Sequence, residues 1–171
     1  MAQMILDLDI RPLTRDAFVL FGDVIETKGA EHFPINDGAA ERYHNLARVD
    51  VNAENGEPLV NIFRGQPLPS PIEIKMMERH PLGSQAFIPL QPHDYLVVVA
   101  PASGRVAPSD LKAFRASGGQ GVNYHRNVWH HPLLVLNADH EFIVIDRGGP
   151  RENCDEYYFG ENEGFVRLEA S

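Results

Sequence analysis

Two stretches of the sequence gather side chains that could carry acid–base or metal chemistry. Residues 78–85 contain a carboxylate at Glu78, an imidazole at His80 and an amide at Gln85. Residues 121–132 contain three of the eight histidines within seven residues, together with the single tryptophan. Because imidazole titrates near neutral pH and binds metal ions, the two stretches predict a polar site that transfers protons or holds a cation.

Each stretch also has an ordinary structural explanation. The strand before Glu78 could end near Met77, which would leave the charged residues in a solvated turn. In the second stretch, Trp129 could be a core residue while one histidine is hydrogen-bonded and another is exposed. His130 and His131 fall on opposite faces if they begin a strand, so at most one of them can point inward. These alternatives stay open.

The alternation that leads into Glu78 favours the functional interpretation. Every second residue over positions 72–76 is apolar, and the same face continues into Glu78 and His80 because strand side chains alternate with period two. A buried carboxylate or imidazole is costly unless it is paired, hydrogen-bonded or bound to a metal. We therefore expect a barrel mouth that holds a polar site.

The remaining candidate residues are less specific. Arg64 ends an apolar strand and could reach an interior carboxylate, although surface ion pairing is the ordinary role of such an arginine. Cys154 is the only cysteine, so no intramolecular disulfide can form and a reducing compartment is the simplest interpretation. The sequence contains no P-loop, dinucleotide glycine fingerprint, Gly-x-Ser-x-Gly or His-Glu-x-x-His motif.

Strand signals dominate the chain, and 13 Pro and 14 Gly punctuate many short elements. The clearest strands are expected at residues 59–63, 95–100, 133–136 and 142–145. The segment 95–100 is apolar enough to be buried on both faces. One short helix is expected at residues 14–20 with Thr14 as N-cap, and Ser109-Asp110 caps a second helix or precedes a strand. This pattern predicts an antiparallel sandwich or barrel, with helix in less than about a fifth of the residues.

Size and charge exclude several functional classes. The 171 residues fit one domain, which we take to span residues 1–171. A formal net charge of −9 disfavours nucleic acid and anionic membranes as partners, but it allows a small anionic substrate. The N-terminus lacks a signal peptide, and the longest apolar run is too short to span a membrane. A cytoplasmic protein is expected.

These motifs, with others along the chain, resemble the ureidoglycolate lyase family, whose members are also called ureidoglycolate hydrolases. The resemblance covers most of the chain, from about Ile10 to about Tyr157. It is carried by residues 21–26, 41–44, 78–83, 85–89, 121–132 and 145–149. The most specific of these segments is Asn-Tyr-His-Arg-Asn-Val-Trp-His-His-Pro at residues 123–132.

The resemblance implies a mainly β fold, a cupin-type double-stranded antiparallel β-barrel (jelly roll) with a few short helices, usually assembled as a homodimer. It implies a lyase that converts (S)-ureidoglycolate to glyoxylate and urea in allantoin and purine catabolism. Two alternatives are kept. One is an amidohydrolase that releases ammonia and carbon dioxide from ureidoglycolate, and the other is a non-catalytic cupin that binds a small acid.

The positions of the cupin motifs imply that Glu78, His80, Gln85 and His130 share the barrel interior. Relative to the usual cupin pattern, Glu replaces one His and Gln replaces the usual Glu. Two imidazoles, a carboxylate and an amide could still hold a divalent metal, with Ni²⁺ favoured because it suits imidazole nitrogen. The alternative is that no metal is bound.

The substrate determines the roles that the resemblance suggests. In ureidoglycolate one carbon carries a carboxylate, a hydroxyl and a urea nitrogen, so its collapse needs a base for the hydroxyl and an acid for the departing nitrogen. The expected catalytic residues are Glu78, His80 and His130. The expected substrate-binding residues are Arg64, Gln85, Tyr124 and His125, with Arg64 on the carboxylate and Gln85 and Tyr124 at the urea end.

Overall fold

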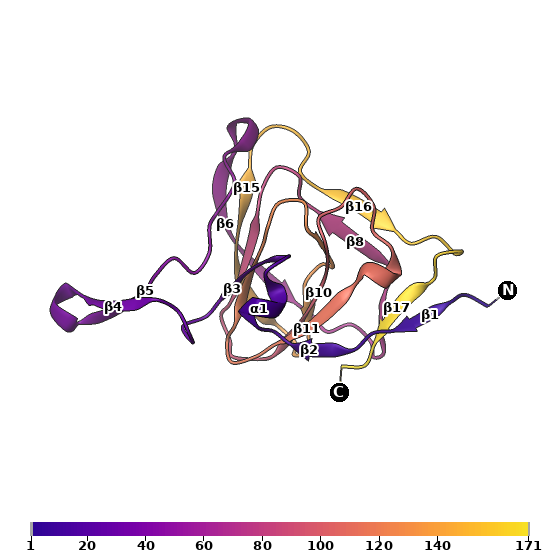
Figure 1. The fold of residues 1–171 in the computed structure, drawn as a ribbon, viewed down its shortest axis with the longest axis horizontal. Coiled ribbons are helices and arrows are strands. Elements are labelled where there is room, and N and C mark those ends of the chain that lie inside the picture. Colours follow the sequence, from indigo (N-terminus) through magenta and orange to yellow (C-terminus); the bar gives the residue numbers. More distant parts are fainter. Residues whose placement is uncertain (1, 171) are drawn as a thin grey trace.

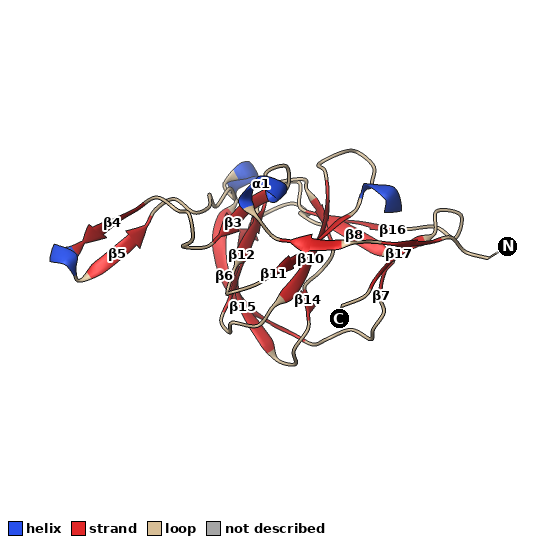
Figure 2. Ribbon diagram, turned by 60° about the horizontal axis from the view of Figure 1, so that its bottom comes forward, coloured by secondary structure: helices blue, strands red, loops and turns tan. Residues whose placement is uncertain are grey.

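The computed structural model describes residues 2–170, of which 44% lie in strands and 8% in helices. The prediction of a mainly β protein with little helix is therefore confirmed. Two strand pairs, β1–β17 and β2–β11, are parallel, and the other pairs among residues 2–170 are antiparallel. This arrangement is consistent with a cupin-type double-stranded β-barrel (Figures 1 and 2).

Two sheets enclose the barrel interior. The five-stranded sheet has the order β3 (Gly22–Ile25), β12 (Gly121–Tyr124), β9 (Gln85–Pro89), β15 (His140–Gly148) and β6 (Glu57–Gly65). The seven-stranded sheet has the order β16 (Asp155–Tyr158), β8 (Met76–Arg79), β13 (Trp129–His130), β10 (Tyr95–Ala100), β11 (Lys112–Ala116) and β2 (Ile10–Pro12), and β14 (Leu134–Val135) also pairs with β10. Apolar side chains of both sheets meet in one cluster, the inner core.

A third layer covers the outer face of the seven-stranded sheet. It is a three-stranded sheet of β1 (Ile5–Asp7), β17 (Phe165–Leu168) and β7 (Ile72–Ile74). Its apolar residues form a second cluster, the outer core, with side chains from the back of the seven-stranded sheet. Strand β10 lies between the two cores, with Tyr95, Val97 and Val99 in one and the intervening residues in the other. Burial of this strand on both faces, as predicted, is confirmed.

The helices are short connections. Helix α1 covers only Arg15–Phe18, and the side chain of Thr14 accepts a hydrogen bond from its first turn, as expected of an N-cap. Three 3-10 helices occupy Asn36–Gly38, Ala53–Asn55 and Pro108–Asp110, and the last leads directly into strand β11. Among residues 2–170, no helix has the length and apolar character needed to cross a membrane.

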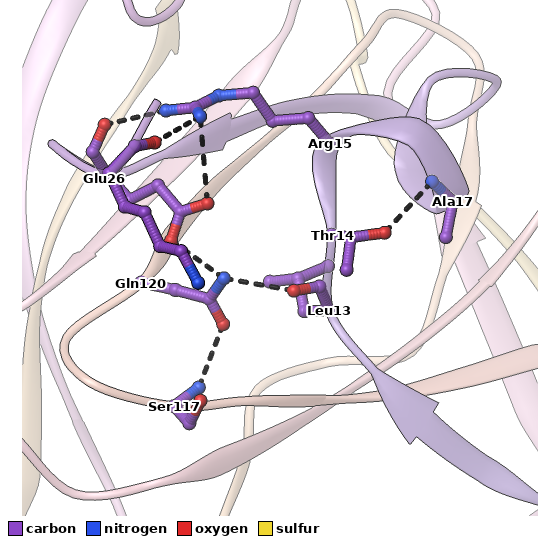
Figure 3. A network of polar contacts seen from close by, with 8 residues as sticks. Leu13, Thr14, Arg15, Ala17, Glu26, Ser117 and Gln120 are labelled. Carbon is purple, nitrogen blue, oxygen red and sulfur yellow. Dashed lines mark hydrogen bonds and ion pairs between the residues drawn. The ribbon is translucent and has the colours of Figure 1, made fainter. Parts of the chain in front are cut away.

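A buried amide ties the start of the chain to the barrel (Figure 3). The side-chain nitrogen of Gln120 donates to the carbonyl oxygen of Leu13 at 3.0 Å and to the Glu26 carboxylate at 2.9 Å. Its side-chain oxygen accepts from the Ser117 amide at 3.0 Å. Arg15 donates to the Glu26 carbonyl from the other side at 2.7 Å. The network fixes α1, the end of β3 and the β11–β12 turn relative to one another.

The extended segment expected over residues 72–80 is interrupted at Lys75, between β7 and β8. Met77, which uninterrupted alternation would place outward, is fully buried in the outer core with the isoleucines of β7. The side chain of Glu78 lies on the other face of β8 from Met77 and therefore faces the barrel interior. The predicted interior position of Glu78 agrees with the structure, but the unbroken alternation behind that prediction is wrong, because the strand changes sheets at Lys75.

A β-hairpin projects from the barrel as a separate arm, which we call the β4–β5 arm. It consists of β4 (His32–Ile35) and β5 (Ala40–Tyr43), paired with each other in a two-stranded sheet. Figures 1 and 2 both show it standing away from the other strands, on the side where β6 lies. Its residues are exposed or half-buried. A two-stranded hairpin is marginal in water by itself, so the arm needs support from outside its own strands.

Gly22 offers a test of the packing between β3 and β12. A β-carbon at this position would lie 1.9 Å from the backbone oxygen of Asn123. Gly22→Ala should therefore cost about 1–3 kcal/mol of folding free energy or more, as overpacking does. The expected loss in melting temperature is about 2–4 °C per kcal/mol. Gly104→Ala is the matched control, since no atom lies within 4 Å of the new β-carbon, and equal melting of the two variants would refute this account.

Candidate functional site

A carboxylate and two imidazoles meet inside the barrel. Glu78 on β8 and His130 on β13 are opposite each other in register, and Glu78 Oε1 lies 3.5 Å from His130 Nε2. The His80 ring follows β8 and lies 5.0 Å from the His130 ring, centroid to centroid. One potential ligand atom from each of the three side chains falls within 4.8 Å of the others. The structure thus brings His130 together with two residues that precede it in the chain by 50 positions or more.

Backbone carbonyls orient both imidazole rings. The Nδ1 atom of His130 lies 3.2 Å from the carbonyl oxygen of Val128, and Nδ1 of His80 lies 2.7 Å from that of Asn153. A carbonyl only accepts, so each Nδ1 carries the proton and donates it. In the neutral rings the lone pairs are then on the Nε2 atoms, which face the cluster. This is the tautomer that metal-binding histidines commonly adopt.

Burial sets the charge state of the cluster. Burial lowers the pKa of His130 below its usual value, and the nearby carboxylate of Glu78 offsets this only in part. Burial would raise the pKa of Glu78, but the neighbouring imidazoles of His130 and His80 outweigh it and lower that pKa. At neutral pH the site therefore contains a carboxylate beside a neutral imidazole, whose Nε2 is buried and has no hydrogen-bond partner among residues 2–170.

Gln85 on β9 completes the cluster with an amide. Its Nε2 donates to Asp146 Oδ2 at 3.2 Å, and its Oε1 lies 3.0 Å from His80 Nε2. His80 consequently has an acceptor next to each ring nitrogen, and in the tautomer with its proton on Nδ1 the lone pair of Nε2 faces Gln85 Oε1. A cation between His80 Nε2 and Gln85 Oε1 would satisfy both lone pairs. Two ligand atoms about 3 Å apart also suit neighbouring positions around a metal with bonds of about 2.1 Å.

Aromatic and apolar residues line the site. The Tyr124 ring stacks on His130 with centroids 4.2 Å apart and planes 4° from parallel. Burial raises the pKa of Tyr124, so its hydroxyl stays neutral near pH 7. A hollow of about 440 Å³ opens in front of the cluster. It is lined by Phe63, Arg64, Gly65, Glu78, Gln85, Phe87, Pro132 and Leu133. The hollow is large enough for a small acid.

Cys154 lies beside the cluster. Its thiol donates to Glu78 Oε2 at 3.7 Å, so the two carboxylate oxygens of Glu78 face different neighbours. Partial burial and the charges of Glu78 and nearby carboxylates raise the pKa of Cys154 to about 11. Without a cation at its sulfur, the thiol is therefore protonated at neutral pH and is a poor nucleophile there.

Two predicted site residues lie apart from the cluster. Arg64 shares the outer face of β6 with Val60 and Ile62, which are 73% and 62% exposed. Its guanidinium pairs at 3.1 Å with Glu141, the residue opposite it in register on β15. The expectation that Arg64 points toward a buried anion is wrong, because alternation along β6 turns it outward. It also lines the hollow, together with Glu78 and Gln85.

His125 also lies elsewhere. It follows Tyr124, whose ring points inward, and so it falls on the opposite face. Its Nε2 lies 3.0 Å from Asp23 Oδ2, and that hydrogen bond raises the pKa of His125 despite partial burial. It lines a separate surface hollow with Arg48, Asp50 and Arg126. The structure does not bring His125 to the cluster with Glu78.

Three residues that support the cluster were not predicted. Asp146 on β15 accepts from the Gln85 amide, and Asn61 on β6 donates to Asp146 Oδ1 at 3.0 Å. Asn153 contributes its backbone carbonyl to His80 and its side-chain oxygen to the Leu82 amide at 2.6 Å. A polar residue among the alternating apolar residues of β15 is the sequence signal that could have identified Asp146. No comparable signal marks the Asn153 carbonyl.

Comparisons with other proteins identify the family of the chain. The family model for ureidoglycolate lyase matches residues 5–166. The ureidoglycolate lyase of Stutzerimonas stutzeri (strain A1501) is 53% identical over 156 residues, or 91% of this chain and 92% of that protein. The ureidoglycolate lyase of Burkholderia cepacia is 57% identical over 150 residues, or 87% and 84% of the two chains. This chain belongs to the ureidoglycolate lyase family.

Proposed function

We propose that the protein is a lyase that converts (S)-ureidoglycolate to glyoxylate and urea in allantoin and purine catabolism. Membership in the ureidoglycolate lyase family supports this activity. The structural observation that carries it is the buried, unpartnered Nε2 of His130 beside the Glu78 carboxylate. A neutral imidazole with a free lone pair, beside a carboxylate that lines a hollow of small-molecule size, suits proton transfer to and from a small substrate.

The elimination requires the transfer of one proton and no water. The hydroxyl of ureidoglycolate loses its proton as the oxygen forms the aldehyde of glyoxylate, the carbon–nitrogen bond breaks, and the urea nitrogen gains a proton. A single imidazole can therefore take the proton at Nε2 and return it to the departing nitrogen. Glu78 Oε1, 3.5 Å from His130 Nε2, stabilises the imidazolium between the two transfers. Tyr124, stacked on the ring, holds it in place.

The same residues fit a divalent cation, with Ni²⁺ favoured for its affinity for imidazole nitrogen. Glu78, His80 and His130 would supply three ligand atoms, and Gln85 Oε1 a fourth. In that case His130 Nε2 would hold the cation instead of taking the proton, because its one lone pair cannot do both. When bound, the cation would supply positive charge that polarises the substrate oxygens next to it. The orientation of both Nε2 lone pairs by backbone carbonyls supports this assignment.

The charge of the substrate gives a second argument for a cation. Ureidoglycolate is an anion, whereas the groups that face the cluster are carboxylates, lone pairs and an amide oxygen. Among residues 2–170, the one arginine that borders the hollow, Arg64, is paired with Glu141 on the outer face. A metal ion at the cluster would therefore be the group best placed to attract the carboxylate of the substrate.

Product analysis tests this function. Incubation with ureidoglycolate should yield equal amounts of urea and glyoxylate, because the elimination releases both. Ammonia with carbon dioxide would identify the amidohydrolase alternative, and binding without turnover would identify a non-catalytic small-acid-binding cupin. Chelation followed by dialysis should reduce turnover at least about tenfold, and added Ni²⁺ should restore it. Full turnover in metal-free protein would refute the metal proposal without affecting the lyase proposal.

Two substitutions distinguish the contribution of the cluster to catalysis from that of the outer face of β6. His130→Ala should lower kcat by about 10²–10⁴-fold, as loss of an acid–base group does. Metal analysis of that variant shows whether His130 is instead a ligand, since loss of a ligand would release the ion. Arg64→Ala should change KM by less than about threefold, because an exposed ion pair contributes little. A tenfold rise in KM would restore Arg64 as the carboxylate-binding residue.

We also propose that the protein acts in the cytoplasm as a single domain, residues 1–171, assembled into a homodimer. Two features support a dimer. The β4–β5 arm projects without packing on the barrel (Figure 2), and β6 is the last strand of its sheet. Strand β6 exposes Val60 and Ile62 on its outer face. An apolar edge strand and an unsupported hairpin on the same side are surfaces that a two-fold partner could cover at once.

Sedimentation tests the dimer proposal. The wild-type protein should sediment as a dimer at micromolar concentration, and Ile62→Asp should raise the dimer dissociation constant at least about tenfold, because a carboxylate would be buried unpaired. Leu20→Asp is the control, since Leu20 is 73% exposed at the end of α1, away from β6. A monomeric wild type, or equal effects of the two substitutions, would refute an interface on β6.

A further inference from the structure

We propose that Asp146 is a positioning residue that fixes the Gln85 amide with its oxygen toward the cluster. The inference rests on the proposed function, because it concerns how the cluster presents ligand atoms to a cation or substrate. It concerns a residue that touches neither directly: Asp146 contacts the cluster through Gln85. Its role would be to determine which end of a symmetric-looking side chain faces inward.

The argument begins with the ambiguity of an amide. The Gln side chain has a donor end and an acceptor end of nearly the same shape, and rotation by half a turn exchanges them. Next to His80 Nε2, the two ends have opposite consequences. The oxygen adds an acceptor to the cluster, whereas the NH₂ group would place a donor there and repel a cation.

Asp146 removes the ambiguity because an ionised carboxylate can only accept hydrogen bonds. Gln85 Nε2 lies 3.2 Å from Asp146 Oδ2, so the donor end is directed away from His80 and Oε1 lies 3.0 Å from the imidazole. In the reversed orientation, the amide oxygen would face the carboxylate. Two acceptors would then be in contact without a proton between them, which is unfavourable in a partly buried site.

Asn61 holds Asp146 in turn. Its side-chain nitrogen donates to Asp146 Oδ1 at 3.0 Å and to the Val144 carbonyl at 3.4 Å. A row of hydrogen-bonded side chains therefore runs from Asn61 on β6 through Asp146 on β15 to Gln85 on β9, across three neighbouring strands of one sheet. Both oxygens of Asp146 accept from amides, and the ion pairs within residues 2–170 do not include it. Such an arrangement serves orientation rather than charge neutralisation.

Asp146→Asn tests the proposal because its own amide can donate as well as accept. Gln85 can then reverse, and the cluster loses a fixed acceptor. Titration of the metal-free protein with Ni²⁺ should show about tenfold weaker binding, within the range typical of residues that orient metal ligands, and kcat should fall by a similar factor. Asp94→Asn is the matched control, since Asp94 pairs with Arg115 on the β10–β11 side. It should change neither quantity more than about twofold.

A double-mutant cycle separates orientation from simple loss of charge. In a Gln85→Met background there is no amide to orient, so Asp146→Asn should change Ni²⁺ affinity and kcat by less than about threefold. The same tenfold loss in both backgrounds would mean that Asp146 acts by charge or by fold stability, and the proposal would be overturned. Melting temperatures of all four proteins show whether stability is involved.

NMR of the Gln85 side chain gives a readout that needs neither metal nor substrate. Its amide protons should show contacts to Asp146 and Asn61 in the wild type, and additional contacts to His80 in Asp146→Asn. Amide protons that face His80 in the wild type would overturn the proposal. If the wild type binds no Ni²⁺ but kcat shows the expected coupling between Asp146 and Gln85, the metal proposal fails while the role of Asp146 stands. If Ni²⁺ binds and the losses from the two substitutions multiply, the metal proposal stands and the positioning role of Asp146 fails.

Discussion

The site depends on one constraint, that side chains on paired strands share a face when their positions match in register. Because His130 is opposite Glu78 across β13 and β8, an imidazole and a carboxylate meet inside the barrel. On the facing sheet, Tyr124 is opposite Gln85. A shift of one residue in either pair would turn these groups outward and replace them with their neighbours in the chain. The two cores therefore stabilise the register on which the chemistry depends.

Much of the fold could be predicted from periodicity. Residues 95–100 form a continuous apolar run, and the structure covers this strand on both faces as expected. The break at Lys75 could not be predicted, because residues 72–76 alternate regularly through it. It arises from tertiary structure, since β7 and β8 pair in different sheets. The β4–β5 arm was not predicted either, because its support does not come from the barrel strands.

The site was only partly predictable for a related reason. Residue type and motif position indicated Glu78, His80, Gln85 and His130, and these four converge. Arg64 has a suitable charge for a carboxylate, but its direction depends on which residues of β6 face inward. Asn61 and Phe63 contact groups on the inner face, which leaves Arg64 outside. The carbonyl oxygens that set the histidine tautomers have no signature in side-chain chemistry at all.

The contact between Cys154 and Glu78 has a consequence for oxidation chemistry. Oxidants attack the thiolate, and the reactivity of a cysteine toward peroxide follows its ionised fraction. With the pKa of Cys154 raised to about 11, that fraction at pH 7 is on the order of 10⁻⁴. Partial burial, together with the carboxylates around the thiol, Glu78 among them, thus protects the only sulfhydryl of the chain. An exposed thiol can therefore stand beside the site without becoming a redox switch.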